Sequence, residues 1–171
     1  MGENNFREFL SLNNIELARY EHEAFMTVAD STLLASKLPG ANTKNLFLRD
    51  KKGLQHFLVV VPAHLSVDLA KLSELLGVNR LGFASAQRLM DYLGVKPGSV
   101  SVFGLVNDRT QSVRCVIDQS LWAADAIHAH PLKNTATMIV SHSNLNKFLA
   151  LTGHIPQIIT VPALDLQPIA D

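Results

Sequence analysis

Residues 45–61 read NLFLRDKKGLQHFLVVV, and this stretch decides the fold class. Two apolar runs, 45–49 and 54–61, lie on either side of the polar turn DKKG at 50–53. Apolar runs separated by a short polar turn that ends in glycine are typical of a β-hairpin. We therefore predict that these two runs form a pair of antiparallel strands.

Helix and strand patterns alternate on both sides of this hairpin. Apolar spacing predicts helices over 6–15, 28–38, 67–76, 86–93 and 144–152, and strands over 17–22, 80–83, 99–103, 113–118, 136–140 and 157–161. Thr27, Ser66 and Ser85 are the predicted N-caps of three of the helices. The strands at 99–103 and 113–118 flank a turn at Asn107-Asp108, so we predict that they form a second hairpin.

Two hairpins argue against a purely parallel sheet. The predicted fold class is α/β, with a mixed, mostly antiparallel, curved sheet surrounded by helices. A length of 171 residues with 47% hydrophobic residues is enough to bury one ordinary core. Because no internal repeat or linker divides the chain, we expect a single domain over residues 1–171.

Composition and charge limit the classes of function. The 15 Lys and Arg residues balance the 15 Asp and Glu residues, so binding to RNA would need a local patch or a partner. The single cysteine, Cys115, excludes a disulfide framework and a multi-cysteine zinc site. No apolar stretch reaches the roughly 18 residues that span a bilayer, and residues 1–5 do not resemble a signal peptide. We expect a soluble, cytoplasmic protein with no membrane partner.

Common catalytic and metal motifs are missing. The chain has no Gly-x-Ser-x-Gly elbow, no phosphate-binding loop that ends in Lys-Ser or Lys-Thr, and no His-Glu-x-x-His. His128 and His130 would lie on one face of a strand, but no cysteine or acidic residue follows at ligand spacing, so we expect no metal site. The remaining histidines are expected to be exposed or hydrogen-bonded surface residues; they include His22, His56, His64 and His142.

Four segments could line a polar site, and each also has an ordinary structural explanation. Lys44 and Asn45 open the first hairpin, where a lysine is either a solvated edge charge or a point charge for a phosphate. Gly153 is either a helix C-cap or part of a loop whose N–H groups face a ligand carbonyl. The segments 94–105 and 130–137 are either turns or the walls of a pocket.

Together, these segments resemble the bacterial prolyl-tRNA editing family, also called the YbaK-like or prolyl-tRNA synthetase insertion-domain superfamily. Within it, the chain is most similar to the free-standing alanyl-tRNA(Pro) deacylases. The matching motifs are Thr43-Lys44-Asn45-Leu46-Phe47-Leu48, Gly94-Val95-Lys96-Pro97-Gly98-Ser99-Val100 with Phe103-Gly104-Leu105, His130-Pro131-Leu132-x-Asn134-Thr135-Ala136-Thr137, and Gly153-His154-x-Pro156. They occur in this order from about residue 20 to residue 160, which makes the combination specific.

The resemblance implies a curved sheet around a small pocket and hydrolysis of the ester between an amino acid and the terminal adenosine of tRNA, without metal or cofactor. Lys44 would hold the 3′ end, Asn45 and His130 would line the amino-acid pocket, and the Gly153 loop would bind the carbonyl oxygen. The free 2′-hydroxyl of the adenosine would assist the attacking water. The residues implied are Lys44, Gly153 and His154 for catalysis, and Asn45, His130, Thr135, Thr137 and Pro156 for substrate binding.

The resemblance also implies the substrate and the partners. A synthetase site shaped for proline cannot strongly exclude alanine, so a second site that admits only small side chains would remove alanine from the tRNA for proline. Two alternatives stay open: a related deacylase for Cys-, Ser- or Thr-tRNA, and a non-catalytic tRNA-binding or regulatory module. Because the chain is neutral overall, prolyl-tRNA synthetase or an elongation factor is expected to deliver the tRNA.

Overall fold

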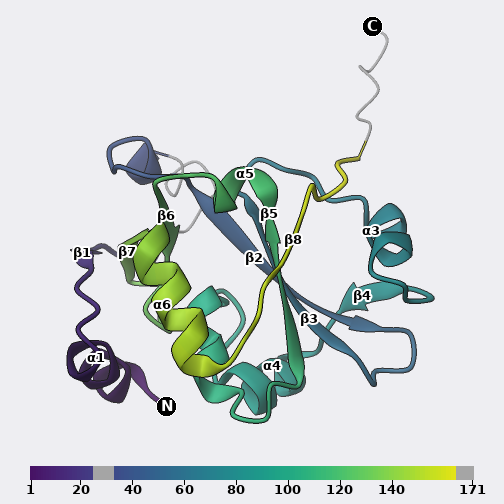
Figure 1. Cartoon of the computed structure of the whole chain (residues 1–171), viewed down its shortest axis with the longest axis horizontal. Coiled ribbons are helices and arrows are strands. Elements are labelled where there is room, and N and C mark those ends of the chain that lie inside the picture. Colours follow the sequence, from purple (N-terminus) through teal and green to yellow (C-terminus); the bar gives the residue numbers. More distant parts are fainter. Residues whose placement is uncertain (25–32, 165–171) are drawn as a thin grey trace, which may run out of the picture.

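The computed structural model describes residues 1–24 and 33–164 of the 171. Its elements alternate along the chain (Figure 1). The helices are α1 (Glu3–Leu12), α3 (Leu69–Leu75), α4 (Ala86–Leu93), α5 (Gln119–Trp122) and α6 (His142–Thr152), with the 3-10 helix η1 (Val102–Asn107). The strands are β1 (Ala18–Glu21), β2 (Thr43–Asp50), β3 (His56–Pro62), β4 (Leu81–Phe83), β5 (Val113–Asp118), β6 (Ala126–Ala129), β7 (Ala136–Ser141) and β8 (Gln157–Ile159).

The strands form two sheets that meet near the start of β2. The larger sheet has the order β4-β2-β3-β5-β8, and the smaller has the order β1-β7-β6. Pairing is antiparallel within β4-β2-β3 and within β1-β7-β6, and parallel within β3-β5-β8. Ala41 joins the sheets, because its N–H donates to the carbonyl of Ala126 at 2.8 Å and its carbonyl accepts from the N–H of His128 at 2.9 Å. The predicted mixed, mostly antiparallel α/β fold is confirmed.

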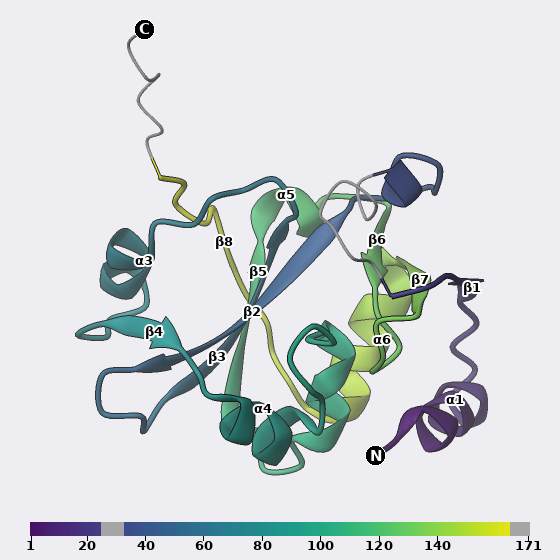
Figure 2. The same ribbon diagram turned by 180° about the vertical axis from the view of Figure 1, so that it is seen from behind.

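Side chains of the large sheet alternate between two cores. Phe47 and Leu58 point to one face, whereas Leu48 and Val59, their neighbours along the same strands, point to the other. The first face packs against α1, α4, η1, α6 and the small sheet, and the second against α3 and the chain that follows β8. Figure 2 shows the molecule from behind, with α3 and α4 well apart. Each of these helices packs against a different core. Both faces are buried, which explains the continuous apolar run in β3.

The central prediction, the hairpin at 45–61, is confirmed by the antiparallel register of β2 and β3, in which Phe47 pairs with Leu58. Ser85 caps α4 as predicted, since its side chain accepts the N–H of Arg88. Ser66 was the wrong cap for α3: the side chain of Asp68 accepts two N–H groups of the first turn instead, and the helix begins later. The predicted Thr27 cap lies outside the described residues.

The predicted second hairpin, 99–103 with 113–118, is wrong. Residues 102–107 form the buried 3-10 helix η1, and β5 lies between β3 and β8, parallel to both. A short apolar run fits a buried helical turn as well as a buried strand, and here the run packs into the core. The second β-hairpin is β6–β7, whose connection holds the polar segment 130–135. His128 lies in a strand, β6, as the metal-site hypothesis assumed, whereas His130 lies just beyond it; α5 was not predicted.

Candidate functional site

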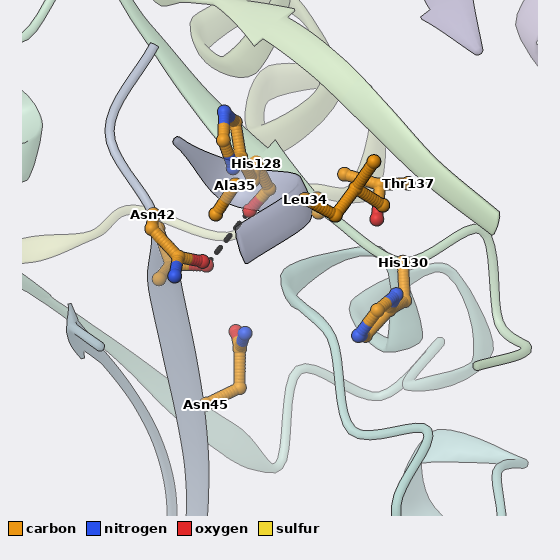
Figure 3. A pocket seen from close by; sticks show the side chains of 9 residues that line it. Leu34, Ala35, Asn42, Asn45, His128, His130 and Thr137 are labelled. Atoms are coloured by element: carbon orange, nitrogen blue, oxygen red, sulfur yellow. Dashed lines mark hydrogen bonds between the residues drawn. The ribbon is translucent and has the colours of Figure 1, made fainter. Parts of the chain in front are cut away.

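A small pocket opens at the junction of the two sheets, where β2 begins and β6 ends. Its volume is about 40 Å³. A cavity that holds one water has about 10–15 Å³, so this pocket has space for a few water-sized groups. Figure 3 shows side chains from β2, β6 and β7 pointing into this space. The lining residues are Leu34, Ala35, Asn42, Thr43, Asn45, His128, Ala129, His130 and Thr137.

Thr43 and Asn45 belong to the pocket because side chains two positions apart on a strand share one face. The hydroxyl of Thr43 donates to the carbonyl of His128 at 2.7 Å, so it ties β2 to β6 beside the pocket. The Oδ1 atom of Asn45 is buried and has no hydrogen-bond partner among residues 1–24 and 33–164. A buried polar atom without a partner is costly, so this amide is prepared for a ligand that can hydrogen-bond to it.

His130 faces Asn45 across the pocket (Figure 3). Its Nδ1 donates to the carbonyl of Ala136 at 2.8 Å, because a carbonyl can only accept. Burial lowers the pKa of the His130 imidazole, the hydrogen bond to Ala136 raises it, and the nearby His22 lowers it further. A neutral ring with Nδ1 protonated leaves Nε2 as a hydrogen-bond acceptor. The site therefore combines two acceptors, Asn45 Oδ1 and His130 Nε2.

Two other polar side chains of the pocket form hydrogen bonds to residues just outside it. The Nε2 of His128 donates to the carbonyl of Pro39 at 2.9 Å, and burial lowers the pKa of this imidazole. The hydroxyl of Thr137 lies 3.0 Å from Nε2 of His22, which comes from the segment after β1. From the sequence, His128 was considered only for a metal site that was not expected, and Thr43 was part of a motif but had no assigned role. The alternation of side chains along β2 and β6 was the signal for both.

Lys44 does not line the pocket. Its neighbours Thr43 and Asn45 do, so alternation along β2 directs the Lys44 side chain to the opposite face of the sheet. Lys44 pairs with Val61 in β3 and is half-buried. Thr135 is also outside the pocket lining, and its carbonyl accepts the N–H of His22 at 3.0 Å. The structure thus brings together Asn45, His130 and Thr137 of the predicted residues.

Gly153, His154 and Pro156 lie at the far end of α6 and do not line this pocket. Gly153 has a left-handed φ of 75° and caps the helix. Its N–H donates to the carbonyl of Ala150 at 3.2 Å, and the N–H of His154 donates to that of Leu149 at 3.0 Å. Both groups are engaged within the helix end, so the geometry does not support the expected contact with a carbonyl oxygen.

The contacts of His154 indicate a structural role. Its ring is buried, with Nε2 3.1 Å from Oδ2 of Asp108 and Nδ1 3.0 Å from the hydroxyl of Thr152. Asp108 also accepts the N–H groups of Ser112 and Val113 at 3.0 and 2.7 Å. This network fastens the end of α6 to the start of β5.

Two further expectations concern residues outside the pocket. His56 is not a surface histidine: it is 1% exposed, Nη1 of Arg88 donates to its Nε2 at 2.7 Å, and its ring stacks on Tyr92 at 4.1 Å. Burial lowers its pKa, and the charge of Arg88 lowers it further. Cys115 is buried in the core, and burial raises the pKa of its thiol to about 12, so it is no nucleophile near neutral pH.

In residues 1–24 and 33–164, no three His, Cys, Asp or Glu side chains gather in a way that could hold a metal ion. No helix in the same ranges is long and apolar enough to cross a membrane.

Comparison with known proteins gives consistent matches. The family described as "Aminoacyl-tRNA editing domain" matches residues 22–148. The chain is 37% identical over 134 residues to the prolyl-tRNA editing protein ProX of Acetoanaerobium sticklandii, covering 78% of this chain and 82% of that protein. It is 39% identical over 155 residues to the prolyl-tRNA synthetase associated domain-containing protein 1 of Danio rerio, covering 90% and 84%.

A solved structure supports the fold. It is described as a candidate trans-editing enzyme for prolyl tRNA synthetase, and it superposes on this chain with a TM-score of 0.70 at 22% identity. The superposition covers 94% of this chain and 97% of that one. At this identity the likeness concerns the fold alone.

Proposed function

The chain belongs to the aminoacyl-tRNA editing domain family, and on this basis we propose that it is a deacylase that removes alanine from mischarged tRNA for proline. The relative named a prolyl-tRNA editing protein supports the choice of tRNA, since it is 37% identical over most of both chains. The pocket supports the choice of amino acid, because its room of about 40 Å³ suits a small side chain.

The observation that carries this proposal is the pair of acceptors in the pocket. The α-ammonium group of an aminoacyl ester has three N–H donors, and Asn45 Oδ1 is buried there without a partner. His130 Nε2 offers a second acceptor on the opposite wall. With the ammonium group held between them, the side chain of the amino acid points toward the small groups of the pocket, which include Ala35 and Ala129.

The reaction is an ester hydrolysis. Water adds to the ester carbonyl carbon, the bond to the adenosine oxygen breaks, and free amino acid and tRNA leave. Asn45 and His130 hold the amino acid in one orientation, and the 2′-hydroxyl of the adenosine assists the water, so catalysis rests on positioning. Lys44, near the start of β2, anchors a phosphate or ribose oxygen of the 3′ end outside the pocket that its neighbours line.

Size and polarity together select the substrate. Excluding one extra methylene by apolar contacts alone contributes only about 1–3 kcal/mol, so the pocket acts as a second sieve after the synthetase. Proline differs from alanine in two ways, since it is larger and its secondary ammonium group has one donor fewer. The two acceptors of the pocket therefore favour a primary amine, in addition to the limit on size.

A panel of charged tRNAs tests the proposal. The tRNA for proline is charged with alanine, cysteine, serine or proline, and release of each amino acid by the wild type is followed over time. We expect fast release of alanine, with Lys44→Ala and His130→Ala both reducing the rate at least tenfold. The matched control variants are Lys147→Ala and His64→Ala, since both residues are exposed and lie outside the pocket.

Each unexpected result has a definite meaning. Faster release of cysteine or serine than of alanine contradicts the alanine specificity and points to a related deacylase. Absence of release from every charged tRNA contradicts the enzymatic role and leaves the alternative of a tRNA-binding module. Loss of rate in the control variants would show that the effects of Lys44→Ala and His130→Ala are not specific to the site.

A further inference from the structure

Four positive side chains lie on or reach the turn that joins β2 to β3, at the end of the hairpin away from the pocket, and a fifth, that of Arg114, donates to Gln55 just after the turn. We call this cluster the basic tip: Arg49, Lys51, Lys52, Arg88 and Arg114. Lys51 and Lys52 are exposed residues of the turn itself. Arg49 and Arg88 reach it from β2 and from α4. Segments far apart in the sequence thus contribute charge to one place.

The arginines of the basic tip bind neutral groups, which leaves their charge uncompensated. Nη1 of Arg49 donates to the carbonyl of Lys51 at 3.2 Å, and Nη1 of Arg88 donates to that of Gly53 at 3.0 Å. Nη2 of Arg114 donates to the side-chain oxygen of Gln157 at 3.1 Å, and its guanidinium lies 4.9 Å from the centre of the Phe57 ring.

Within residues 1–24 and 33–164, no carboxylate forms an ion pair with the basic tip. In the described parts of the chain, ion pairs within 4.0 Å are formed by other cations, namely Arg19, Lys71, Lys133 and His154. The one acidic residue of the turn, Asp50, is buried, and its Oδ1 accepts the N–H groups of Leu54 and Gln55 at 2.7 and 3.0 Å. Its charge is directed to the backbone and not to the lysines around it.

Some cations elsewhere in the chain, which is neutral overall, are paired with carboxylates. The cations Arg19 and Lys133 lie near α1 and are paired with Glu3 and Glu21. Figure 1 shows α1 and the turn between β2 and β3 on opposite sides of the molecule. Unpaired Lys and Arg side chains on one side are the usual binding surface for a phosphate backbone.

We propose that the basic tip binds the phosphate backbone of the acceptor arm of the tRNA whose 3′ end enters the pocket; this inference rests on the proposed function. Asn45 and Asp50 are five residues apart on β2, which places the tip roughly 17 Å from the pocket. A contact at that distance reaches the stem of the tRNA and not its terminal adenosine. A hollow of about 600 Å³, walled by Lys51, Lys52 and Leu54, lies beside it.

Binding of tRNA at different salt concentrations tests the inference. The double variant Lys51→Ala/Lys52→Ala is compared with Arg7→Ala/Lys147→Ala, which removes two exposed charges elsewhere. Loss of two phosphate contacts lowers the salt slope by about 1.4–1.8, so between 50 and 200 mM salt the wild type should lose about tenfold more affinity than the tip variant. Fluorescence anisotropy of labelled tRNA gives Kd, and circular dichroism verifies folding.

Deacylation kinetics provide a second test of the inference. The tip variant should show a raised KM and an unchanged kcat on alanylated tRNA, and wild-type rates on a short alanylated oligonucleotide that ends in CCA and lacks the arm. Equal salt slopes and equal KM values in the tip and control variants would overturn the inference. If the wild type hydrolyses neither substrate, the proposed function fails, while the salt slope still decides whether the basic tip binds tRNA.

Discussion

Replacing Asn45 by leucine should make the protein more stable and less active. Leucine has nearly the shape of asparagine without its polar atoms, and it occupies a strand position that pairs with Val60. The substitution removes the buried Oδ1 atom that lacks a partner. A buried polar group without a hydrogen bond costs about 1–3 kcal/mol, so the free energy of unfolding should rise by about 1 kcal/mol or more.

Urea denaturation and thermal melting measure this gain. For a chain of this length, about 1 kcal/mol corresponds to about 2–4 °C in Tm. Hydrolysis of alanylated tRNA is measured in parallel and should fall at least tenfold, because a hydrogen bond to a charged ammonium group contributes about 1.5–3 kcal/mol. The two effects have opposite signs only if Asn45 is present for the ligand and not for the fold.

Thr43→Val is the matched control. Thr43 lines the same pocket on the same face of β2, but its hydroxyl already donates to the carbonyl of His128 at 2.7 Å. Loss of a satisfied hydrogen bond should reduce stability by about 0.5–1.5 kcal/mol. If Asn45→Leu instead destabilises the protein as Thr43→Val does, or if it leaves deacylation intact, the reasoning from the unpartnered amide is refuted.

Three other predictions concern charge, pH and the end of α6. The pKa values of His56, His128 and His130 are lowered in the folded state, so the unfolded chain binds protons first as the pH falls through about 6.5. The free energy of unfolding, measured in urea, should therefore be highest near pH 7.5 and lower at pH 5.5. The same free energy at both pH values would contradict the neutral state of these rings. Lys44→Ala should reduce kcat/KM for alanylated tRNA by about 10- to 100-fold, as expected for a charged hydrogen bond, while the free energy of unfolding changes by less than about 0.5 kcal/mol. Gly153→Ala should lower the free energy of unfolding by about 1–2 kcal/mol, because the residue has a φ of 75° and an added Cβ would lie 2.2 Å from Nε2 of Gln111. The kcat of this variant should equal that of the wild type. A hundredfold loss of kcat would instead support binding of the ester carbonyl oxygen by the Gly153 loop.

Local patterns predicted the central hairpin because both strands and their turn lie in one stretch of sequence. Ser85 was likewise predictable as an N-cap, since a cap is a contact between near neighbours. The pairing of β5 was not predictable in this way. Its partners β3 and β8 lie far away along the chain, and the run at 102–107 fits a strand and a buried turn equally well.

The site shows a second limit of sequence reasoning. Lys44 and Asn45 are adjacent in one motif, yet the strand that contains them directs their side chains to opposite faces of the sheet. A strand at this position already implied that adjacent side chains point to opposite faces. Gly153 illustrates the converse problem, because a glycine after a helix suits both a cap and a ligand-binding loop. The engaged N–H groups of Gly153 and His154 decide for the cap, and only their hydrogen bonds could decide it.

The size of the pocket depends on how the two sheets are joined. Of the described hydrogen bonds at this junction, two are made by the backbone of Ala41 and one by the hydroxyl of Thr43. Gly40 precedes them with a φ of 98°, and a Cβ there would lie 3.0 Å from the carbonyl oxygen of Ala126, so the close approach of the sheets requires glycine. The proposed sieve for small side chains requires a pocket whose size does not change. The backbone hydrogen bonds of Ala41 hold the two sheets at a fixed separation beside that pocket.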